Sequence, residues 1–429
     1  MPPLAMGSPG IGSLDRGSVA MVEPLRESAP NLHDRYSEAN RSMAGAPQFS
    51  TGDHFSRKLG LFYAAYFFFG GIQLPFFPLW LGARGLDAQT IGFVIAVPMV
   101  VRIIATPLIT HWADRRRALR GTIIGASILA ACAMAAVGSM QGAVPIFVMF
   151  VVAAAAFSPV LSLTDAYALS GLSMRGRAYG PVRLWGSAAF VVGNIVAGAM
   201  LERFAPGNLI WLIVLALTMA AVASRALDPV EAKGKAAPAE LPWQSPKVLL
   251  RNPAFLAVAL ASAMIQSSHA LYYGFSTVQW RAAGLDGTLI GALWAIGVVA
   301  EIALFAWSGR LPAPLRPAVW LAIGGAGAIL RWGVMAFDPP VVLLVPLQLL
   351  HACSFAAAHL GLMGFMARSV PRELAARAQG YVATLSSLVN ASATLASGFV
   401  YAAVGSHAYL VMAAMAAVGV ASAVYASRR

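Results

Sequence analysis

The sequence predicts an all-α membrane protein in which twelve transmembrane helices form two six-helix bundles. Hydrophobic residues make up 59% of the chain and charged residues only 11%, and the mean hydropathy is +0.71. A soluble domain carries about 25% charged residues, so the composition excludes a soluble protein. The apolar stretches approach the ~20 residues that a helix needs to cross a bilayer. They are too long and too continuous for the strands of a membrane barrel.

Twelve apolar stretches follow one another along the chain, separated by polar, glycine- or proline-containing connections. The predicted spans are residues 58–82, 90–110, 121–140, 143–168, 181–202, 207–225, 254–280, 288–308, 317–337, 340–366, 377–402 and 405–426.

Two segments lack such stretches and divide the chain. Residues 1–56 are rich in Gly, Ser, Pro and charge, which predicts a disordered cytoplasmic tail. Residues 226–253 contain the charged, Ala- and Pro-rich run EAKGKAAPAELPWQSPK, which is typical of a linker. We therefore expect six-helix bundles at residues 57–225 and 254–429, joined by a cytoplasmic linker.

The formal net charge of +13 is explained by where the basic residues lie. They gather in alternate loops, whereas the other loops hold only Arg84, Arg203 and Arg281. This asymmetry follows the positive-inside rule and predicts a multi-pass protein of a bacterial-type inner membrane with both termini in the cytoplasm. No basic patch remains that needs a nucleic-acid partner, and we expect a monomer in the lipid bilayer. The basic loop residues are Arg115, Arg116, Arg117, Arg120, Arg175, Arg177, Arg225, Lys233, Lys235, Lys247, Arg251, Arg310, Arg316, Arg368, Arg372, Arg377, Arg428 and Arg429.

Short repeats relate the two halves. The sequence Arg-Ala-x-Gly occurs at residues 177–180 and 377–380, in each case after the fourth span of its half. Residues 112–115 (WADR) and 307–310 (WSGR) follow the second span of each half. A duplicated six-helix unit is a known transporter architecture, with the substrate site at the interface of the repeats.

A lone carboxylate marks the eighth span. Glu301 is the only ionisable residue in LIGALWAIGVVAEIALFAWS, residues 289–308. A charge inside the membrane costs a few kcal/mol and normally faces a protein interior or a water-filled path. A carboxylate shielded from water binds a proton more readily than an exposed one. Glu301 is therefore our first candidate for proton coupling, and Asp165 at the end of the fourth span is the second.

Three arginines lie within or beside spans of the two halves. Arg183 opens the fifth span and is expected to pair with Asp165, either structurally or as a gate. Arg102 lies in the middle of the second span and suits an anionic substrate or a partner for Asp165. Arg331 lies toward the outer end of the ninth span, where a snorkelling side chain is the favoured interpretation.

Polar and aromatic stripes on the first, seventh and tenth spans give further candidates for substrate binding. They are Gln73; Gln266, His269 and Tyr273, with Thr277 and Trp280 on the same helical face; and His351 and His359. His351 and His359 are eight residues apart, which does not predict a chelating metal site. Phe67, Phe68 and Phe69, beside Gln73, are expected to face lipid.

The loop THWADRRRALR, residues 110–120, resembles the signature loop of the major facilitator superfamily at Asp114 and Arg115, although Thr110 and Arg117 stand where that signature has glycine. Further segments resemble the phenylpropionate permease branch of this superfamily: YGPVRLWGS at 179–187, LWAIGVVAE at 293–301 and QLLHACSFAAAH at 348–359. The resemblance covers residues 57–426. It implies transport by alternating access, with proton-coupled import of 3-phenylpropionate in founding members. We expect Asp114, Arg115, Asp165 and Arg183 to form a gating charge network.

The resulting hypothesis is proton-coupled symport of a small organic anion such as an aromatic carboxylate. Proton-driven efflux of drugs or metabolites, and symport of a nucleoside or sugar, stay open as alternatives. The sequence has no HExxH, no G-x-S-x-G, no clustered Cys/His ligands and no nucleotide-binding P-loop. We therefore expect neither an enzyme nor a cofactor or metal.

Overall fold

The computed structural model describes residues 54–230, 247–310, 315–371 and 374–428, which all belong to one compact unit. These residues form helices and connections without a strand. The predicted tail lies outside the described residues except for residues 54–56, and so does most of the predicted linker. The predicted domain boundaries therefore stay predictions.

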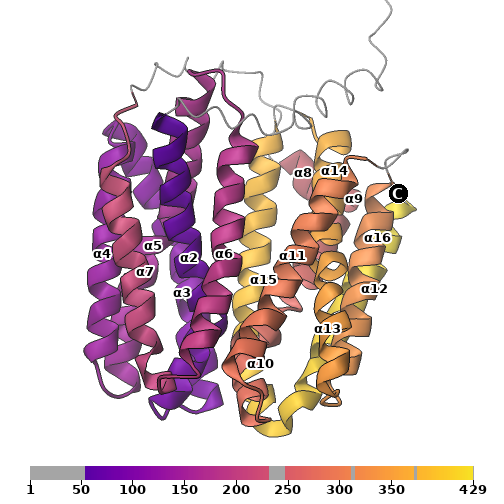
Figure 1. Ribbon diagram of the computed structural model, residues 1–429. Helices are drawn as coiled ribbons and strands as arrows, with labels where there is room; N and C mark the ends of the chain where they lie inside the picture. Colours follow the sequence, from indigo (N-terminus) through magenta and orange to yellow (C-terminus); the bar gives the residue numbers. More distant parts are fainter. Residues whose placement is uncertain (1–53, 231–246, 311–314, 372–373, 429) are drawn as a thin grey trace, which may run out of the picture. The chain divides into compact units, whose positions relative to one another are not determined.

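The helices run side by side in Figure 1. The amino-terminal half consists of α2 (His54–Ala83), α3 (Ala88–Arg115), α4 (Leu119–Ser139), α5 (Ala143–Ser173), α6 (Tyr179–Met200), η1 (Pro206–Asn208) and α7 (Leu209–Arg225). The carboxyl-terminal half consists of α8 (Lys247–Arg251), α9 (Pro253–Ser267), α10 (Ala270–Ala282), α11 (Gly287–Ser308), α12 (Pro317–Met335), α13 (Val341–Leu349), η2 (Ala352–Ala357), α14 (Ala358–Ser369), α15 (Ala375–Val404), η4 (Gly405–Ala408) and α16 (Tyr409–Ser427).

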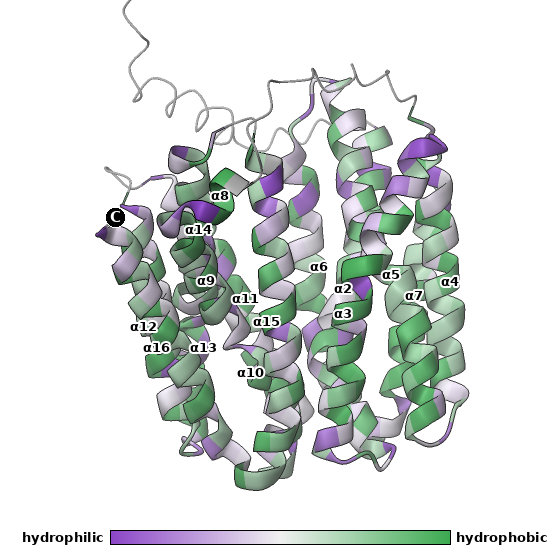
Figure 2. Cartoon of the chain, turned by 180° about the vertical axis from the view of Figure 1, so that it is seen from behind, coloured by the Kyte–Doolittle hydropathy of each residue, from purple (hydrophilic) through white to green (hydrophobic). Residues whose placement is uncertain are grey.

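The twelve predicted spans are confirmed, with ends that differ by about five residues at most. Eleven helical stretches of the described residues are long and apolar enough to cross a membrane, and the last, Arg377–Ser427, contains two helices, α15 and α16. Large apolar side chains such as Ile104, Leu108 and Val342 are exposed on the helix surfaces, as lipid contact requires. Figure 2 shows hydrophobic residues along the middle of the helices and hydrophilic residues concentrated near their ends.

The seventh and tenth spans are not continuous helices. The seventh is interrupted by a turn at Ser268 and His269, between α9 and α10. The tenth passes from α13 through a turn into the wider π-helical segment η2. Such interruptions free backbone groups and redirect side chains, and they often occur at functional sites. Here they bring the rings of His269 and His351 to a centroid distance of 5.2 Å.

A repeated turn begins the second span of each half. Residues 85–92 read GLDAQTIG and residues 284–291 read GLDGTLIG. The glycine of each turn has a positive φ, 82° and 86°. The Asp87 side chain accepts from the Thr90 N–H at 2.8 Å, and Asp286 accepts from the Leu289 N–H at 2.7 Å, so each aspartate caps its helix. The hydrogen bonds from Thr90 also lower the pKa of Asp87 below its usual value.

The two halves pack closely where α3 meets α15 and where α6 meets α11. A Cβ on Gly398 would lie 3.1 Å from the Cα of Gly92, and a Cβ on Gly198 would lie 3.1 Å from the Cα of Gly291. Gly198 and Gly398 follow the repeated Arg-Ala-x-Gly sequences by the same number of residues. The two glycine junctions are thus equivalent positions of the duplicated unit. Both lie near the helix ends that adjoin the repeated turns.

A hydrogen bond supplements one junction. The Gly287 N–H, at the start of α11, donates to Oε1 of Glu202 at 2.5 Å. This bond joins the amino-terminal half to the first turn of a helix in the other half, where a carboxylate also meets the positive end of the helix dipole.

Candidate functional site

Three neighbouring cavities lie between the two halves, and Tyr273 on α10 borders all of them. Their volumes are about 260, 130 and 460 Å³. We call the first the aromatic cavity, the second the small cavity and the third the large cavity. Together they occupy the interface of the two halves, which is where a repeat-based transporter places its substrate site.

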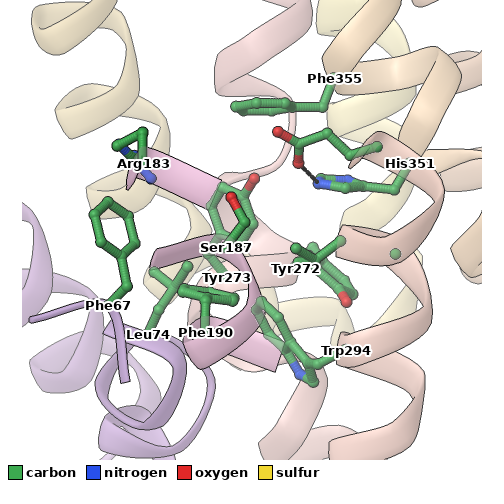
Figure 3. Close-up of a pocket in the computed structure, with 13 residues that line it drawn as sticks. Phe67, Leu74, Arg183, Ser187, Phe190, Tyr272, Tyr273, Trp294, His351 and Phe355 are labelled. Atoms are coloured by element: carbon green, nitrogen blue, oxygen red, sulfur yellow. Dashed lines mark ion pairs between the residues drawn. The ribbon is translucent and has the colours of Figure 1, made fainter. Parts of the chain in front are cut away.

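Rings from both halves enclose the aromatic cavity (Figure 3). Tyr272 and Trp294 pack at a centroid distance of 4.4 Å, and Tyr273 lies 5.9 Å from Trp294. The Trp294 Nε1–H donates to the Thr277 hydroxyl at 3.0 Å, which fixes the indole ring. The cavity is lined by Phe67, Leu74, Arg183, Ser187, Phe190, Tyr272, Tyr273, Trp294, Gly297, Val298, Glu301, His351 and Phe355.

Glu301 lies on α11 in the wall of this cavity, and its side chain is about one-fifth exposed. Its Oε2 atom is 3.5 Å from Nε2 of His351, the contact marked by the dashed line in Figure 3. Arg183 enters the same cavity from α6 of the other half. The cavity therefore carries a carboxylate and a guanidinium on walls that belong to different halves.

Behind Glu301 lies a buried polar network centred on Arg331. Arg331 is completely buried and donates to Oε1 of Gln348 at 2.5 Å and to Nδ1 of His351 at 3.0 Å. Its guanidinium also lies 4.5 Å from the ring centroids of Tyr272 and Trp332. Because Arg331 is an obligatory donor, Nδ1 of His351 accepts and the proton of the neutral ring is on Nε2, toward Glu301. His351 thus links Arg331 to Glu301.

The prediction that Arg331 snorkels is wrong. The guanidinium turns into the protein because Gln348, His351 and the two aromatic faces replace the water that a snorkelling side chain would seek. A signal for this arrangement was present in the sequence. Gln348, His351 and Ser354 recur every three residues on the tenth span, which is a polar face too wide for contact with lipid.

Replacing Arg331 with methionine is expected to lower the melting temperature of the purified protein markedly. The change leaves Gln348 Oε1 and His351 Nδ1 without their donor, at a cost of about 1–3 kcal/mol for each buried acceptor. Arg310→Met, at an exposed position, is the matched control and should melt close to the unaltered protein. Equal melting temperatures for the two variants would show that the network contributes no stability.

The predicted stripe on the seventh span is divided by the interruption of that helix. His269 is completely buried behind the aromatic cavity, where its Nε2 lies 3.0 Å from the Ser354 hydroxyl. Gln266 lines the large cavity, and Tyr273 lines all three. Thr277 and Trp280 are buried in the protein. The side chains do not share one face because the turn at Ser268 and His269 breaks the helical period.

The other predicted binding residues are distributed over the cavities. Gln73 lines the small cavity, and Arg102, whose side chain stays exposed, borders both the small and the large cavities. His359 lines the large cavity and contacts the ring of Phe305 edge-on at 5.8 Å. His351 lines the aromatic cavity. No single one of the three cavities contains all of these side chains.

The predicted charge network has hydroxyl partners rather than ion pairs in this structure. Oδ1 of Asp165 accepts from Tyr63 at 2.6 Å and from Tyr179 at 2.8 Å. Over the part of the chain that the structure describes, no ion pair joins Asp165 to Arg102 or Arg183; the ion pairs there are Lys58–Asp228 and His351–Glu301. Asp114 and Arg115 are exposed at the end of α3. In the described ranges no group of His, Cys, Asp or Glu is placed to hold a metal.

Sequence reasoning missed most of the aromatic walls. Phe190, Tyr272 and Trp294 line the aromatic cavity. Phe67, expected to face lipid, lines it too, and Phe69 is buried. Aromatic residues are common on both the lipid-facing and the cavity-facing surfaces of such helices, so the residue type alone does not show which surface a residue occupies. The helical period offered a signal, because Phe67, Leu74 and Phe77 recur with Gly70 on one side of the first span.

Sequence comparison with known proteins identifies the family of this chain. The sequence model of the MFS_1 like family matches residues 56–411. The chain is 33% identical over 370 residues to the "Probable 3-phenylpropionic acid transporter" of Escherichia coli (strain K12), covering 84% of this chain and 95% of that relative. It is 28% identical over 311 residues to the maltose permease of Geobacillus stearothermophilus, covering 68% and 74%.

Solved transporters share the fold at low sequence identity. The nucleoside transporter NupG superposes with a TM-score of 0.75 at 14% identity, covering 87% of this chain and 99% of that one. A bacterial homolog of the human lysosomal transporter Spinster, in an inward-facing and unoccupied conformation, gives a TM-score of 0.69 at 13% identity, covering 90% and 98%. The helical architecture, the duplicated halves and the matched family model agree, and the chain belongs to the MFS_1 like family of the major facilitator superfamily, as a multi-pass membrane transporter.

Proposed function

We propose that this transporter carries a small aromatic carboxylate together with a proton, by alternating access. The observation that supports the proposal most strongly is the aromatic cavity, which combines ring walls with Arg183 from one half and Glu301 from the other. Rings bind an aryl group through its large apolar surface, and the two charged groups suit an anion and a proton. The role is transport rather than catalysis.

Glu301 is the proposed proton site. The carboxylate is only partly exposed, faces the cavity and has His351 beside it at 3.5 Å. When ionised, it is the counter-charge of buried Arg331 through His351; when protonated, it is neutral and the cavity becomes more positive. A proton can therefore change the charge of the substrate site without moving a helix. Asp165, held by two tyrosine hydroxyls, stays the second candidate.

The proposed substrate class rests on size and chemistry. Ligand cavities in proteins are mostly apolar with a few oriented polar groups, and the aromatic cavity, at about 260 Å³, has this character. A phenyl ring with a short acid chain would place its ring against Tyr272, Tyr273 and Trp294 and its carboxylate toward a cationic wall. The Escherichia coli relative is named as a probable 3-phenylpropionic acid transporter, which supports the same class.

We also propose that both termini are cytoplasmic and that the structure is an inward-open state. The glycine junctions then close the outer side, and the large cavity, lined by Gln379 and Val382 near the start of α15, faces the cytoplasm. A membrane-impermeant thiol reagent applied to intact cells should label Gly284→Cys and leave Arg120→Cys unlabelled. The reverse pattern would contradict this topology. In mild detergent the protein should elute as a monomer.

The large cavity favours a second candidate substrate class. It is about 460 Å³ and carries Gln266, Gln379, Ser386 and Asn390, which suit a hydroxyl-rich ligand such as a nucleoside or a sugar. The maltose permease relative is consistent with that alternative. Efflux of metabolites would use the same cavities in the opposite direction.

A panel of ligands separates these classes. We expect 3-phenylpropionate to raise the melting temperature of the purified protein, whereas maltose and uridine do not. Saturating ligand at about 100 times its Kd stabilises the folded state by ~2.7 kcal/mol, which is a readily measured shift. Stabilisation by maltose or uridine without any by aromatic acids would contradict the proposed substrate class.

A further inference from the structure

Arg183 is a cation without a polar partner in the wall of the aromatic cavity. Within the described ranges it makes no hydrogen bond and no ion pair, although it is half-buried. Its guanidinium lies over the ring of Phe67, 3.8 Å from the centroid, and 5.6 Å from the centroid of Tyr63. Figure 3 shows Arg183 beside Phe67, across the cavity from His351.

The stacking on Phe67 orients Arg183 while leaving its donors free. A guanidinium that lies on an aromatic face is held there by cation–π attraction. Its N–H groups lie in the plane of the guanidinium and point away from its centre, so the ring below does not block them. Those donors match the two oxygens of a carboxylate in a bidentate arrangement. A half-buried guanidinium whose donors are unused is a favourable site for an anion, because a bound carboxylate accepts the hydrogen bonds that the protein does not.

The other arginines near the cavities are less suited to this role. Arg331 is completely buried and lines none of the three cavities, and its terminal Nη1 and Nη2 groups already donate to His351 and Gln348. Arg102 lines the small and large cavities, not the aromatic cavity, and its side chain is exposed. Of these three arginines, Arg183 alone lies in the wall of the aromatic cavity, where its donors are unused.

We propose that Arg183 is the specificity-determining residue that binds the substrate carboxylate, while the rings of Tyr272, Tyr273 and Trp294 take the aryl group. This inference rests on the proposed function and replaces Arg102 as the expected anion ligand. It also explains how the site can reject neutral aromatic compounds. A neutral aromatic compound would displace the water around the Arg183 guanidinium without supplying a carboxylate to replace those hydrogen bonds.

The test compares an acid with its neutral isostere. Binding of 3-phenylpropionate and of 3-phenylpropionamide is measured by quenching of tryptophan fluorescence for the unaltered protein, Arg183→Gln and Arg102→Gln. We expect the unaltered protein and Arg102→Gln to prefer the acid by roughly 10- to 100-fold, the range of a charged hydrogen-bonded pair. Arg183→Gln should bind acid and amide about equally, and its retained affinity for the amide would show that the cavity is intact.

The possible outcomes distinguish an error in the role of Arg183 from an error in the proposed transport of aromatic acids. An undiminished acid preference in Arg183→Gln, or loss of that preference in Arg102→Gln instead, would overturn the inference and leave aromatic acid transport standing. Failure of the unaltered protein to bind the acid at all would overturn both. If Arg183→Gln does not fold, Arg183→Lys decides: the charge without the planar fork should weaken the preference for the acid, and an unchanged preference would count against Arg183.

Discussion

Replacing Glu301 with glutamine is expected to reduce concentrative uptake of 3-phenylpropionate to the level of protein-free liposomes while leaving substrate exchange intact. Glutamine keeps the shape and a hydrogen-bonding group beside His351 but cannot bind and release a proton. A carrier that cannot cycle its proton site cannot use a pH gradient, whereas exchange of bound substrate needs no proton release. The binding of the acid should persist, because the glutamine side chain resembles the protonated carboxyl of Glu301 and adds no negative charge opposite Arg183.

The measurement uses proteoliposomes with an acidic exterior for driven uptake and with preloaded substrate for exchange. Asp165→Asn is the matched comparison, since it removes the other candidate carboxylate while keeping an acceptor for Tyr63 and Tyr179. Driven uptake that survives in Glu301→Gln but is lost in Asp165→Asn would transfer the proton site to Asp165. Driven uptake in both variants would remove both carboxylates from the mechanism.

Leucine at Gly198 or at Gly398 is expected to stop transport by holding the outer side open. A Cβ on Gly398 would lie 2.6 Å from the carbonyl oxygen of Ala88, and one on Gly198 would meet the carbonyl oxygen of Gly287. Both obstacles are backbone atoms of the opposite half, which cannot rotate away as a side chain can. The halves must therefore separate at this end, and the proposed inward-open state would lose its outer seal. We expect transport to fall at least tenfold in each variant.

Accessibility of the cavity measures this shift directly. A single cysteine at Ser187, in a background without Cys132 and Cys353, should react with an impermeant reagent from outside faster in both leucine variants than in the parent. Gly121→Leu is the control, because a Cβ there would have no neighbour within 4 Å. Unchanged labelling and transport in Gly198→Leu and Gly398→Leu would mean that these junctions do not close the outer side.

The fold followed from the sequence because the length of an apolar stretch is a sufficient signal for a membrane helix. The twelve predicted spans needed only small corrections at their ends. The interruptions of the seventh and tenth spans were not predicted, since hydropathy does not distinguish a continuous helix from a broken one. The glycine junctions were predictable in part: GLDAQTIG and GLDGTLIG repeat, and Gly198 and Gly398 keep the spacing of the Arg-Ala-x-Gly repeat. Which helices meet at these glycines depends on the tertiary structure and could not be predicted from the repeats.

The place of a candidate site residue could be predicted when its own type and span were sufficient evidence. It could not be predicted when it depended on contacts with side chains of other helices. The sequence singled out Glu301 because no other charge lies in its span, and the structure places it in the cavity wall. Arg331 and Arg183 look alike in sequence, each a lone arginine in or beside an apolar run. Their surroundings differ because Gln348 and His351 satisfy the first, whereas an aromatic ring stacks on the second. Such differences depend on residues of other helices, which local pattern does not reveal.

Proton movement on addition of substrate shows whether substrate and proton cross the membrane together, as we propose. Proteoliposomes without an imposed gradient, in weakly buffered medium with an external pH indicator, receive 3-phenylpropionate from outside. We expect the medium to become more alkaline as substrate enters, the signal to scale with substrate uptake, and Glu301→Gln to give none. Entry of 3-phenylpropionate into vesicles of the unaltered protein with no accompanying proton movement would contradict coupled transport.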